Sequence, residues 1–168
     1  MKPVLPGGTI GILGGGQLGR MMAVSARRMG YRAIILDPAA DGPAAQAADE
    51  HIQAPLGDLK AARLLAERSD VVTMEWELIP AETLKEIEKL KPLYPNASVL
   101  RVIADRLAQK EFLTKNGFAQ APYAAVDDRS SLDKAASKIG FPCILKRRRA
   151  GYDGKGQQTL NTRGGLVG

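Results

Sequence analysis

Near its end the chain carries a run of cations followed by closely spaced glycines, within residues 146–157. The cations are Lys146, Arg147, Arg148, Arg149 and Lys155, and the glycines are Gly151, Gly154 and Gly156. Glycines let backbone N–H groups approach an anion closely, and fixed cations beside them neutralise its charge. The stretch therefore predicts a flexible loop that closes over a polyphosphate.

Two other interpretations of this stretch stay open, a solvated loop and a nucleic-acid patch. Residues 141–168 hold six Lys/Arg against one Asp, which is +5 of the formal +6, and the rest of the chain holds 18 basic against 17 acidic residues. Nucleic-acid binders usually show a broader basic surface with interleaved aromatic residues. Because the charge is local, we favour the phosphate loop and expect no nucleic-acid partner.

A second glycine-rich turn lies near the start of the chain. The buried run 9–13 predicts a strand, and Gly14, Gly16 and Gly19 follow it in the spacing of a dinucleotide-binding turn, with Asp37 18 residues after Gly19. The helix that begins near Gln17 would offer its N-terminal amides to an anion. The pattern leaves three readings open: NAD, the phosphate of another ligand, or a tight turn alone.

Two carboxylates follow the next clear strand, 70–74, at Glu75 and Glu77. Ligands of open parallel sheets bind beyond the carboxyl ends of the strands, so these side chains could bind amino or hydroxyl groups. They could equally favour the helix that begins near Pro80, where negative charge is stabilising. Trp76 between them is interpreted as a packing residue, and His51 as a surface or packing residue.

The elements around these residues alternate between strands and helices, which predicts an α/β fold with a Rossmann-like parallel sheet. Expected strands are 9–13, 32–36, a short one near 51–52, and 70–74; expected helices are 17–29, 58–68 and 80–90. Their expected apolar faces are Leu18, Met21, Met22 and Met29; Leu59, Ala62, Leu65 and Ala66; and Leu84, Ile87 and Leu90. Asp58 is the expected N-cap of the second helix.

A second unit is expected after the helix that residues 99–110 lead into and that ends near Gly117. We therefore predict a Rossmann-like domain over 1–117 and the beginning of another domain over 118–168. The second would contain a strand at 122–126, a helix from Ser130, a strand at 141–145, the glycine-rich loop, and a strand at 157–160. Without further helices, one face of its sheet stays uncovered.

The bulk composition describes a globular chain of 168 residues, 45% hydrophobic and 25% charged. No apolar run approaches the roughly 20 residues that span a bilayer, and no secretory signal is visible, so we expect a cytoplasmic protein without a membrane partner. A single Cys143 and a single His51 exclude an internal disulfide and a Cys/His metal site.

Four stretches resemble, in this order, the ATP-grasp ligases, and among them the 5-(carboxyamino)imidazole ribonucleotide synthase family of purine biosynthesis, the ATPase subunit of phosphoribosylaminoimidazole carboxylase. They are 14–22, 71–77, 103–110 and 144–157, and together they extend over nearly the whole chain. The Tyr152-Asp153 insertion in the last glycine-rich loop sets this family apart from other ATP-grasp proteins. The first motif is not specific alone.

The resemblance implies an ADP-forming carbon–nitrogen ligase. ATP would phosphorylate bicarbonate to carboxyphosphate, and the resulting carbon dioxide would be attacked by the amine of 5-aminoimidazole ribonucleotide. It further implies that Arg106 and Lys146 contact the ATP phosphates and that the loop closes over them, through Gly151, Tyr152, Asp153, Gly154, Lys155, Gly156 and Gln157. Of these, Tyr152, Asp153 and Lys155 would act on the substrate and bicarbonate side. The ribonucleotide would be held by Gly16, Gln17, Leu18 and Gly19, with Glu75 facing its aminoimidazole ring.

Three departures from the family pattern are visible. Ala150 stands where the family often has another glycine, and Met74 and Trp76 replace a more usual aromatic pair. The largest departure is length, because members of the family are considerably longer than this chain. We therefore expect an N-terminal fragment, with a truncated ATP-grasp domain, that is catalytically silent alone. Only Asp153 offers a carboxylate after Lys146, so the Mg²⁺ ligands are expected elsewhere. The family's preference for dimers makes a homodimer possible.

Overall fold

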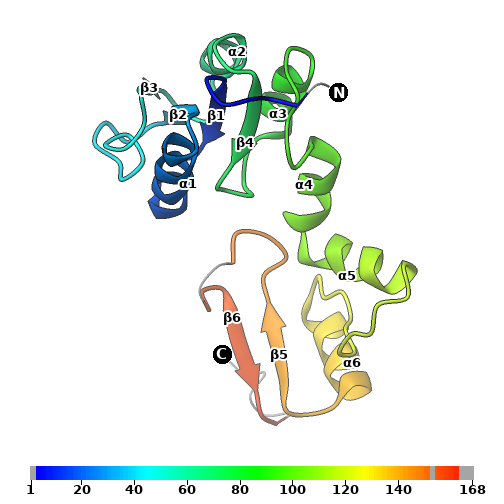
Figure 1. The fold of residues 1–168 in the computed structure, drawn as a ribbon. Helices are drawn as coiled ribbons and strands as arrows, with labels where there is room; N and C mark the ends of the chain where they lie inside the picture. The colour runs from blue at the N-terminus through cyan, green and yellow to red at the C-terminus, as the bar shows by residue number, and fades with distance from the viewer. Residues whose placement is uncertain (1–2, 152–153, 163–168) are drawn as a thin grey trace. The chain divides into compact units, whose positions relative to one another are not determined.

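The structure is a computed structural model that describes residues 3–151 and 154–162. The chain divides into two compact units, Met1–Arg101 and Val102–Gly168, and each is considered by itself (Figure 1). Among the described helices, none is both long enough and apolar enough to cross a bilayer. The domain boundary that the sequence predicts after residue 117 stays a prediction.

The first unit is built on a four-stranded parallel sheet with the order β3-β2-β1-β4. Its strands are β1 (Thr9–Leu13), β2 (Arg32–Asp37), β3 (Glu50–Gln53) and β4 (Val71–Met74), which confirms the four expected strands to within a residue or two. In the register of the sheet, Leu13 pairs with both Leu36 and Met74. The carboxyl ends of β1, β2 and β4 therefore meet at one edge, where the chain leaves each strand.

Helices cover both faces of this sheet (Figure 1). Successive strand residues point to opposite faces. Ile12 and Ile35 pack on the side of helix α1 (Gln17–Arg28), whereas Leu13 and Leu36 pack on the side of α2 (Leu59–Glu67) and α3 (Ala81–Glu88). Residues on both faces are buried because each sheet face is covered, which is why β2 reads as a continuous apolar run.

The first helix does not bury the face that the sequence predicts. Leu18, Met21 and Met29 are 61–64% exposed, and the buried residues of α1 are Gly19, Ala23 and Ala26. Small side chains let the helix lie close to the sheet, and the larger ones are left on the outside. Two other expected core positions are also exposed, Leu59 at 43% and Leu90 at 42%.

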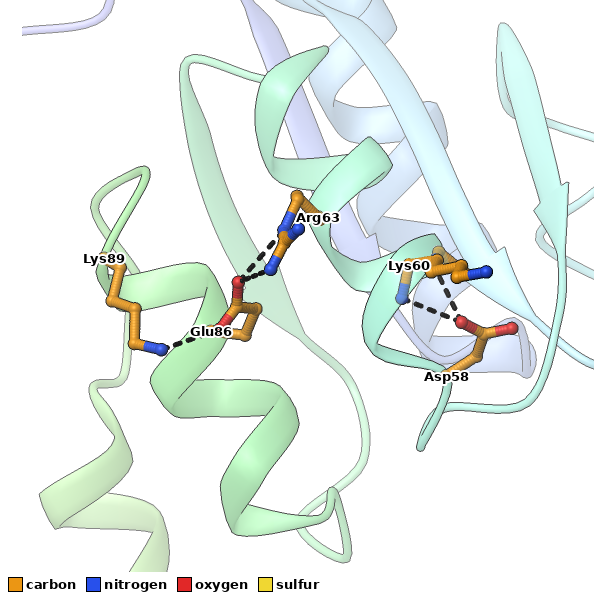
Figure 2. Close-up of polar contacts among 6 residues, drawn as sticks. Asp58, Lys60, Arg63, Glu86 and Lys89 are labelled. Atoms are coloured by element: carbon orange, nitrogen blue, oxygen red, sulfur yellow. Dashed lines mark hydrogen bonds and ion pairs between the residues drawn. The ribbon is translucent and has the colours of Figure 1, made fainter.

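A hydrogen-bonded ion cluster joins α2 to α3 (Figure 2). Arg63 of α2 donates through Nε and Nη2 to Oε1 of Glu86, at 3.0 and 2.5 Å, and Lys89 donates to Oε2 of the same carboxylate at 2.8 Å. Asp58 caps α2, as predicted, by accepting from the Lys60 and Ala61 amides. The two helices are thus joined by charge as well as by the apolar core beneath them.

The second unit begins within a helical region that the sequence indicates as one helix. The structure has two, α4 (Ala97–Ile103) and α5 (Arg106–Lys115), because Asp105 between them has an extended backbone and caps α5. The predicted end of α5 is confirmed, with Gly117 at φ +78°. The strand expected at 122–126 is absent from the described residues. That segment has no regular structure, and Gln120 and Tyr123 hydrogen-bond back to α5 instead.

Beyond that segment lie helix α6 (Arg129–Ile139) and an antiparallel pair, β5 (Cys143–Lys146) and β6 (Gln157–Leu160). Helix α6 begins one residue earlier than predicted, since Asp128 and Ser131 form a capping box. One face of the pair packs on α6 through Leu160, Cys143 and Leu145. On the other face Ile144 is 54% exposed, so among the described residues that face is uncovered, as predicted.

Candidate functional site

The turn after β1 joins the strand to α1 at the carboxyl edge of the sheet. Gly14 has φ +100°, a left-handed conformation that favours glycine, and its amide donates to the Leu36 carbonyl at 3.0 Å. A side chain at Gly14 or Gly16 would collide with Glu75, since an added Cβ would lie 2.5 or 2.8 Å from its atoms. The glycines are therefore needed for the close approach of one carboxylate.

The carboxylate of Glu75 lies at the N-terminus of α1. Its Oε1 accepts from the Gly16 amide at 2.7 Å and its Oε2 from the Gly19 amide at 2.5 Å. The positive end of the helix dipole favours a negative charge there. The structure thus brings together three of the six residues that the resemblance assigned to substrate binding, Gly16, Gly19 and Glu75, although Glu75 follows a different strand.

Asp37 stabilises the backbone of the same turn. Its Oδ2 accepts from the Gly15 amide at 2.8 Å and its Oδ1 from the Ala39 amide at 2.8 Å. Both oxygens of Asp37 are bonded to backbone amides, so this carboxylate fixes the turn after β1 against the segment after β2. A carboxylate with two such bonds keeps further lone pairs for a ligand, so the NAD reading of this motif stays open at this point.

Two backbone amides in the first turn of α1 remain available to a ligand. The N–H groups of Gln17 and Leu18, both exposed residues, have no partner among the hydrogen bonds of the described residues. They point out of a helix N-terminus that has no side-chain cap. This turn can therefore accept one further anion beside Glu75. Trp76 packs against the core, as interpreted from the sequence, and Glu77 is exposed.

In the second unit the glycine-rich loop is closed by the paired strands β5 and β6. Lys146 lies opposite Gln157 in the register, and the Arg147 amide donates to the Gly156 carbonyl at 2.9 Å. Gly154 and Gly156 have φ of +77° and +71°. Ala150 also has a left-handed φ, +58°, at the position where the related family often has glycine. Lys155 is exposed, and the predicted site residues Tyr152 and Asp153 lie outside the described residues.

The uncovered face of this hairpin carries the predicted phosphate-binding lysine. In an antiparallel pair, opposed residues point to the same face. Cys143 and Leu160 face α6, so Ile144 with Thr159, and Lys146 with Gln157, face the opposite way. The open face therefore presents one exposed apolar side chain, Ile144, next to a cation and an amide.

Arg106 reaches the same loop from the start of α5. Its backbone N–H donates to the Arg148 carbonyl at 2.9 Å, and its guanidinium donates to the Gly151 carbonyl. Arg106 and Gly151 are 45 residues apart, and both were assigned to ATP binding from the sequence. The structure thus brings together Arg106 and Gly151, as well as Lys146 and Gln157, around one loop.

Asp105, which sequence reasoning missed, is the buried centre of this region. Only 4% of the residue is exposed, and it accepts from Arg148 and Arg149 while capping α5. Hydrogen bonds from Arg148 and from the Ala108 and Leu107 amides hold the pKa of Asp105 at about 2, although burial opposes them. An Asp directly before a helical run predicts an N-cap, and this pattern is the sequence signal that could have identified Asp105.

The basic run is therefore partly neutralised within the protein. Arg148 and Arg149 both face Asp105, so two of its four consecutive cations are engaged in an ion cluster. A nucleic-acid surface would keep such cations available to phosphates over a broad area. Within the described ranges, no group of three or more His, Cys, Asp or Glu side chains could hold a metal ion. Those residues do not fit a two-magnesium site.

The parallel sheet with its glycine-rich turn and the basic, glycine-rich hairpin both lie within matches to models of the ATP-grasp class of domains. A family model described as the ribonucleotide synthetase preATP-grasp domain matches residues 8–104, and an ATP-grasp domain model matches 111–166. Because the first match covers more than half of the chain, the chain belongs to the ribonucleotide synthetase preATP-grasp family. The resemblance inferred from the sequence is confirmed at this level.

Curated relatives carry the more specific name N5-carboxyaminoimidazole ribonucleotide synthase. The protein of that name from Brucella melitensis is 46% identical over 155 residues, which are 92% of this chain and 43% of the relative. The one from Staphylococcus aureus strain COL is 43% identical over 92% of this chain and 41% of its own length. The chain thus spans about two fifths of the length of the curated relatives it matches.

Solved structures agree with these matches. A crystal structure of an N5-carboxyaminoimidazole ribonucleotide synthetase with ADP superposes with a TM-score of 0.92 at 44% identity, covering 97% of this chain and 43% of that one. The Aspergillus clavatus enzyme in complex with ADP and 5-aminoimidazole ribonucleotide gives 0.84 at 32% identity, over 96% of this chain and 42% of that one. The predicted α/β fold class is confirmed.

Proposed function

We propose that the protein to which this chain belongs carboxylates 5-aminoimidazole ribonucleotide with bicarbonate at the expense of ATP. The products are 5-carboxyaminoimidazole ribonucleotide, ADP and phosphate, as in purine biosynthesis. The observation that carries the proposal is the loop at which Arg106 contacts Gly151 beside the paired Lys146 and Gln157. The names and bound ligands of the relatives support the same assignment.

The ATP side of the reaction is assigned to the second unit. Lys146 and Arg106 bind the phosphates, and the loop from Gly151 to Gln157 lies over them. Fixed cations stabilise the charge that develops on the transferred phosphoryl group. Mg²⁺ would neutralise negative charge on the phosphates in such a reaction. Because the described residues do not fit a metal site, we assign no magnesium ligand within them.

The ribonucleotide side is assigned to the first unit. The free amides of Gln17 and Leu18 bind the substrate phosphate, and Glu75 faces the aminoimidazole. Hydrogen bonds from Gly16 and Gly19 keep the Glu75 carboxylate fixed and in place. A fixed carboxylate can accept a hydrogen bond from an amino group. That bond orients the lone pair of the amine nitrogen for nucleophilic attack.

The chemical steps follow from these roles. A bicarbonate oxygen attacks the γ-phosphorus of ATP, the bond to the β-phosphate oxygen breaks, and ADP leaves. Carboxyphosphate then divides into carbon dioxide and phosphate, and the amine adds to carbon dioxide and loses a proton. Tyr152, Asp153 and Lys155 are proposed to act beside bicarbonate. A loop over the site would keep carboxyphosphate from water.

Four further properties belong to the proposal. The whole protein is cytoplasmic, and the family's preference for dimers makes a homodimer possible. The 168-residue chain alone has no turnover, because the described residues hold no magnesium site. A domain boundary near residue 117 separates a Rossmann-like domain from the beginning of an ATP-grasp domain. Detectable turnover by the chain alone would contradict the proposed absence of turnover.

A thermal-shift series with 5-aminoimidazole ribonucleotide, MgATP and NAD tests the assignment, because a ligand that binds only the native state raises its apparent stability. We expect a shift with the ribonucleotide and none with NAD. The Gly16→Leu variant should lose the ribonucleotide shift, whereas Gly57→Leu, where an added Cβ meets nothing closer than 3.6 Å, should keep it. A shift with NAD alone would overturn the assignment.

A further inference from the structure

Asp105 makes more contacts than an ordinary helix cap. It accepts from the Leu107 and Ala108 amides at 3.0 and 3.3 Å, which satisfies the first turn of α5. It also accepts from Arg148 through Nε at 3.1 Å and Nη2 at 2.7 Å, and from Nε of Arg149 at 3.3 Å. The two bonds from Arg148 end on different oxygens, so the guanidinium is held in a bidentate geometry.

These contacts join two segments that are 43 residues apart in the sequence. One is the first turn of α5, which carries Arg106. The other is the segment after β5, where Arg148 and Arg149 lead towards Gly151. The backbone bond from Arg106 to the Arg148 carbonyl lies beside the same carboxylate. Asp105 therefore fixes the backbone from which Arg106 extends and the base of the loop that Arg106 contacts.

The other two Asp caps of described helices show what capping alone looks like. Asp58 accepts only from the Lys60 and Ala61 amides of α2, and Asp128 accepts from Ser131 of α6; neither has an ion pair with an arginine. Asp105 differs in being buried and in holding two arginine side chains. Capping explains its backbone contacts but not its contacts with the basic run.

The geometry points to Asp105 as a positioning residue for polyphosphate binding, which acts by fixing Arg106 against the base of the glycine-rich loop. The inference rests on the proposed function, since it takes Arg106 and Lys146 as the phosphate-binding cations. The first-turn amides of α5 are already bonded to Asp105 and Arg148, so this helix offers no backbone site for an anion. Recognition of the phosphates therefore depends on where the side chains are held.

The direction in which one substitution changes polyphosphate affinity distinguishes a positioning role from a purely electrostatic one. The Asp105→Asn variant removes a negative charge next to the cations, so electrostatics alone would tighten the binding of a polyphosphate. Positioning predicts the opposite, because Asn cannot hold Arg148 through two oxygens and the loop base loses its anchor. Asn is itself a good N-cap, so α5 should still begin at the same residue.

Binding of tripolyphosphate to this chain, measured by isothermal titration calorimetry at fixed ionic strength, tests the inference. We expect at least a fivefold loss of affinity in Asp105→Asn and less than a twofold change in Asp128→Asn, the matched cap without an arginine partner. The Asp105→Glu variant keeps the charge but displaces it by one methylene, and it should lose affinity in the same direction. If Asp105→Asn does not fold, the affinity of Asp105→Glu tests the positioning role instead.

Each outcome has a definite meaning. Unchanged or tighter binding in both Asp105 variants would overturn the positioning role and leave the proposed function standing. Absence of tripolyphosphate binding by the parent chain would overturn the phosphate-binding role of the basic loop, and the positioning role with it. An equal loss of affinity in Asp128→Asn would show that capping, and not the contact with Arg148, is responsible.

Discussion

At the level of single residues, the charge on Asp105 should make the stability of the protein depend on pH. Its pKa is about 2 in the folded state against an ordinary value of 3.8, so the folded state favours the ionised form. A carboxyl group with a depressed folded pKa contributes stability that is present above its unfolded pKa and is lost as the pH falls through the folded one. The loss should therefore occur between about pH 4 and pH 2.

The measurement is urea unfolding of the parent and Asp105→Asn at several pH values. We expect Asn to lower the free energy of unfolding by about 1 kcal/mol near pH 7, because hydrogen bonds from charged groups are lost. At pH 2, the folded pKa, the parent is half protonated at this site, so the difference between the two proteins should shrink as the pH falls through that value. A difference that persisted undiminished at the acidic end would show that the charge of Asp105 does not stabilise the fold.

Gly19 should be intolerant of even a methyl group. A Cβ added there would lie 2.7 Å from the Gly14 carbonyl oxygen, which belongs to the backbone and cannot turn aside. We expect Gly19→Ala to lower the free energy of unfolding by about 2 kcal/mol, despite the better helix propensity of alanine. Gly57→Ala is the control and should change it by less than about 0.5 kcal/mol. Equal effects in chemical denaturation would refute the close-packing argument.

Residue types and spacing indicated a glycine-rich turn after one strand and carboxylates after another, whereas the binding roles of these residues came from the family resemblance. Gly16 and Glu75 lie 59 residues apart, but both follow parallel strands, and the ends of such strands meet at one edge. Asp105 could not be found in the same way, because its importance depends on Arg148 and Arg149 returning to it from 43 residues away. A cap signal predicts the backbone contacts of an Asp, but not which side chains will face it.

At the level of elements, the contact between α2 and α3 should be sensitive to the charge of Glu86. Hydrogen bonds from Lys89 and Arg63 lower the pKa of Glu86, with burial opposing them. Because the folded pKa is depressed, this contribution is present above the unfolded pKa, near the ordinary value of 4.5, and is lost as the pH falls further. Glu86→Gln should thus lower the Tm at neutral pH.

We expect a fall in Tm of about 2 °C at pH 7 for Glu86→Gln, measured by calorimetry. The matched control is Glu82→Gln in the first turn of the same helix, where a carboxylate has only the weak, solvent-screened benefit of the helix dipole. The two variants should differ at pH 7 and become alike in acid, below the folded pKa of Glu86. If they were alike at both pH values, the cluster in Figure 2 would not contribute to stability.

The elements themselves were predictable wherever the local pattern is strong. The buried runs that became β1, β2 and β4 could be read directly from the sequence, as could the cap at Asp58. The face of α1 could not, since Ala23 and Ala26 are buried for their small size while Met21 is 64% exposed. Hydrophobic periodicity ranks large apolar residues above alanine, and close helix–sheet packing reverses that order.

At the level of the whole molecule, the two units differ greatly in the size of their cores. Among the described residues, 21 of the 24 buried hydrophobic residues lie in Met1–Arg101. The exceptions are Ala135, Ala136 and Leu160. The sequence indicated this difference in part, because it showed a hairpin with one uncovered face. Local opening requires less free energy where few apolar contacts must be broken.

Hydrogen exchange should therefore differ between the units. Backbone amides of β1 and β2, which pack on both faces, should be protected at least about tenfold more than those of β5 and β6. The Leu160→Ala variant removes the largest buried side chain of the α6–hairpin cluster, so it should abolish the remaining protection of β5 and β6. Ile144→Ala is the control, because that side chain lies on the exposed face of the same pair. The exchange is followed by mass spectrometry of peptic fragments. Similar exchange rates in β2 and β5 would mean that the small core does not limit the stability of the second unit.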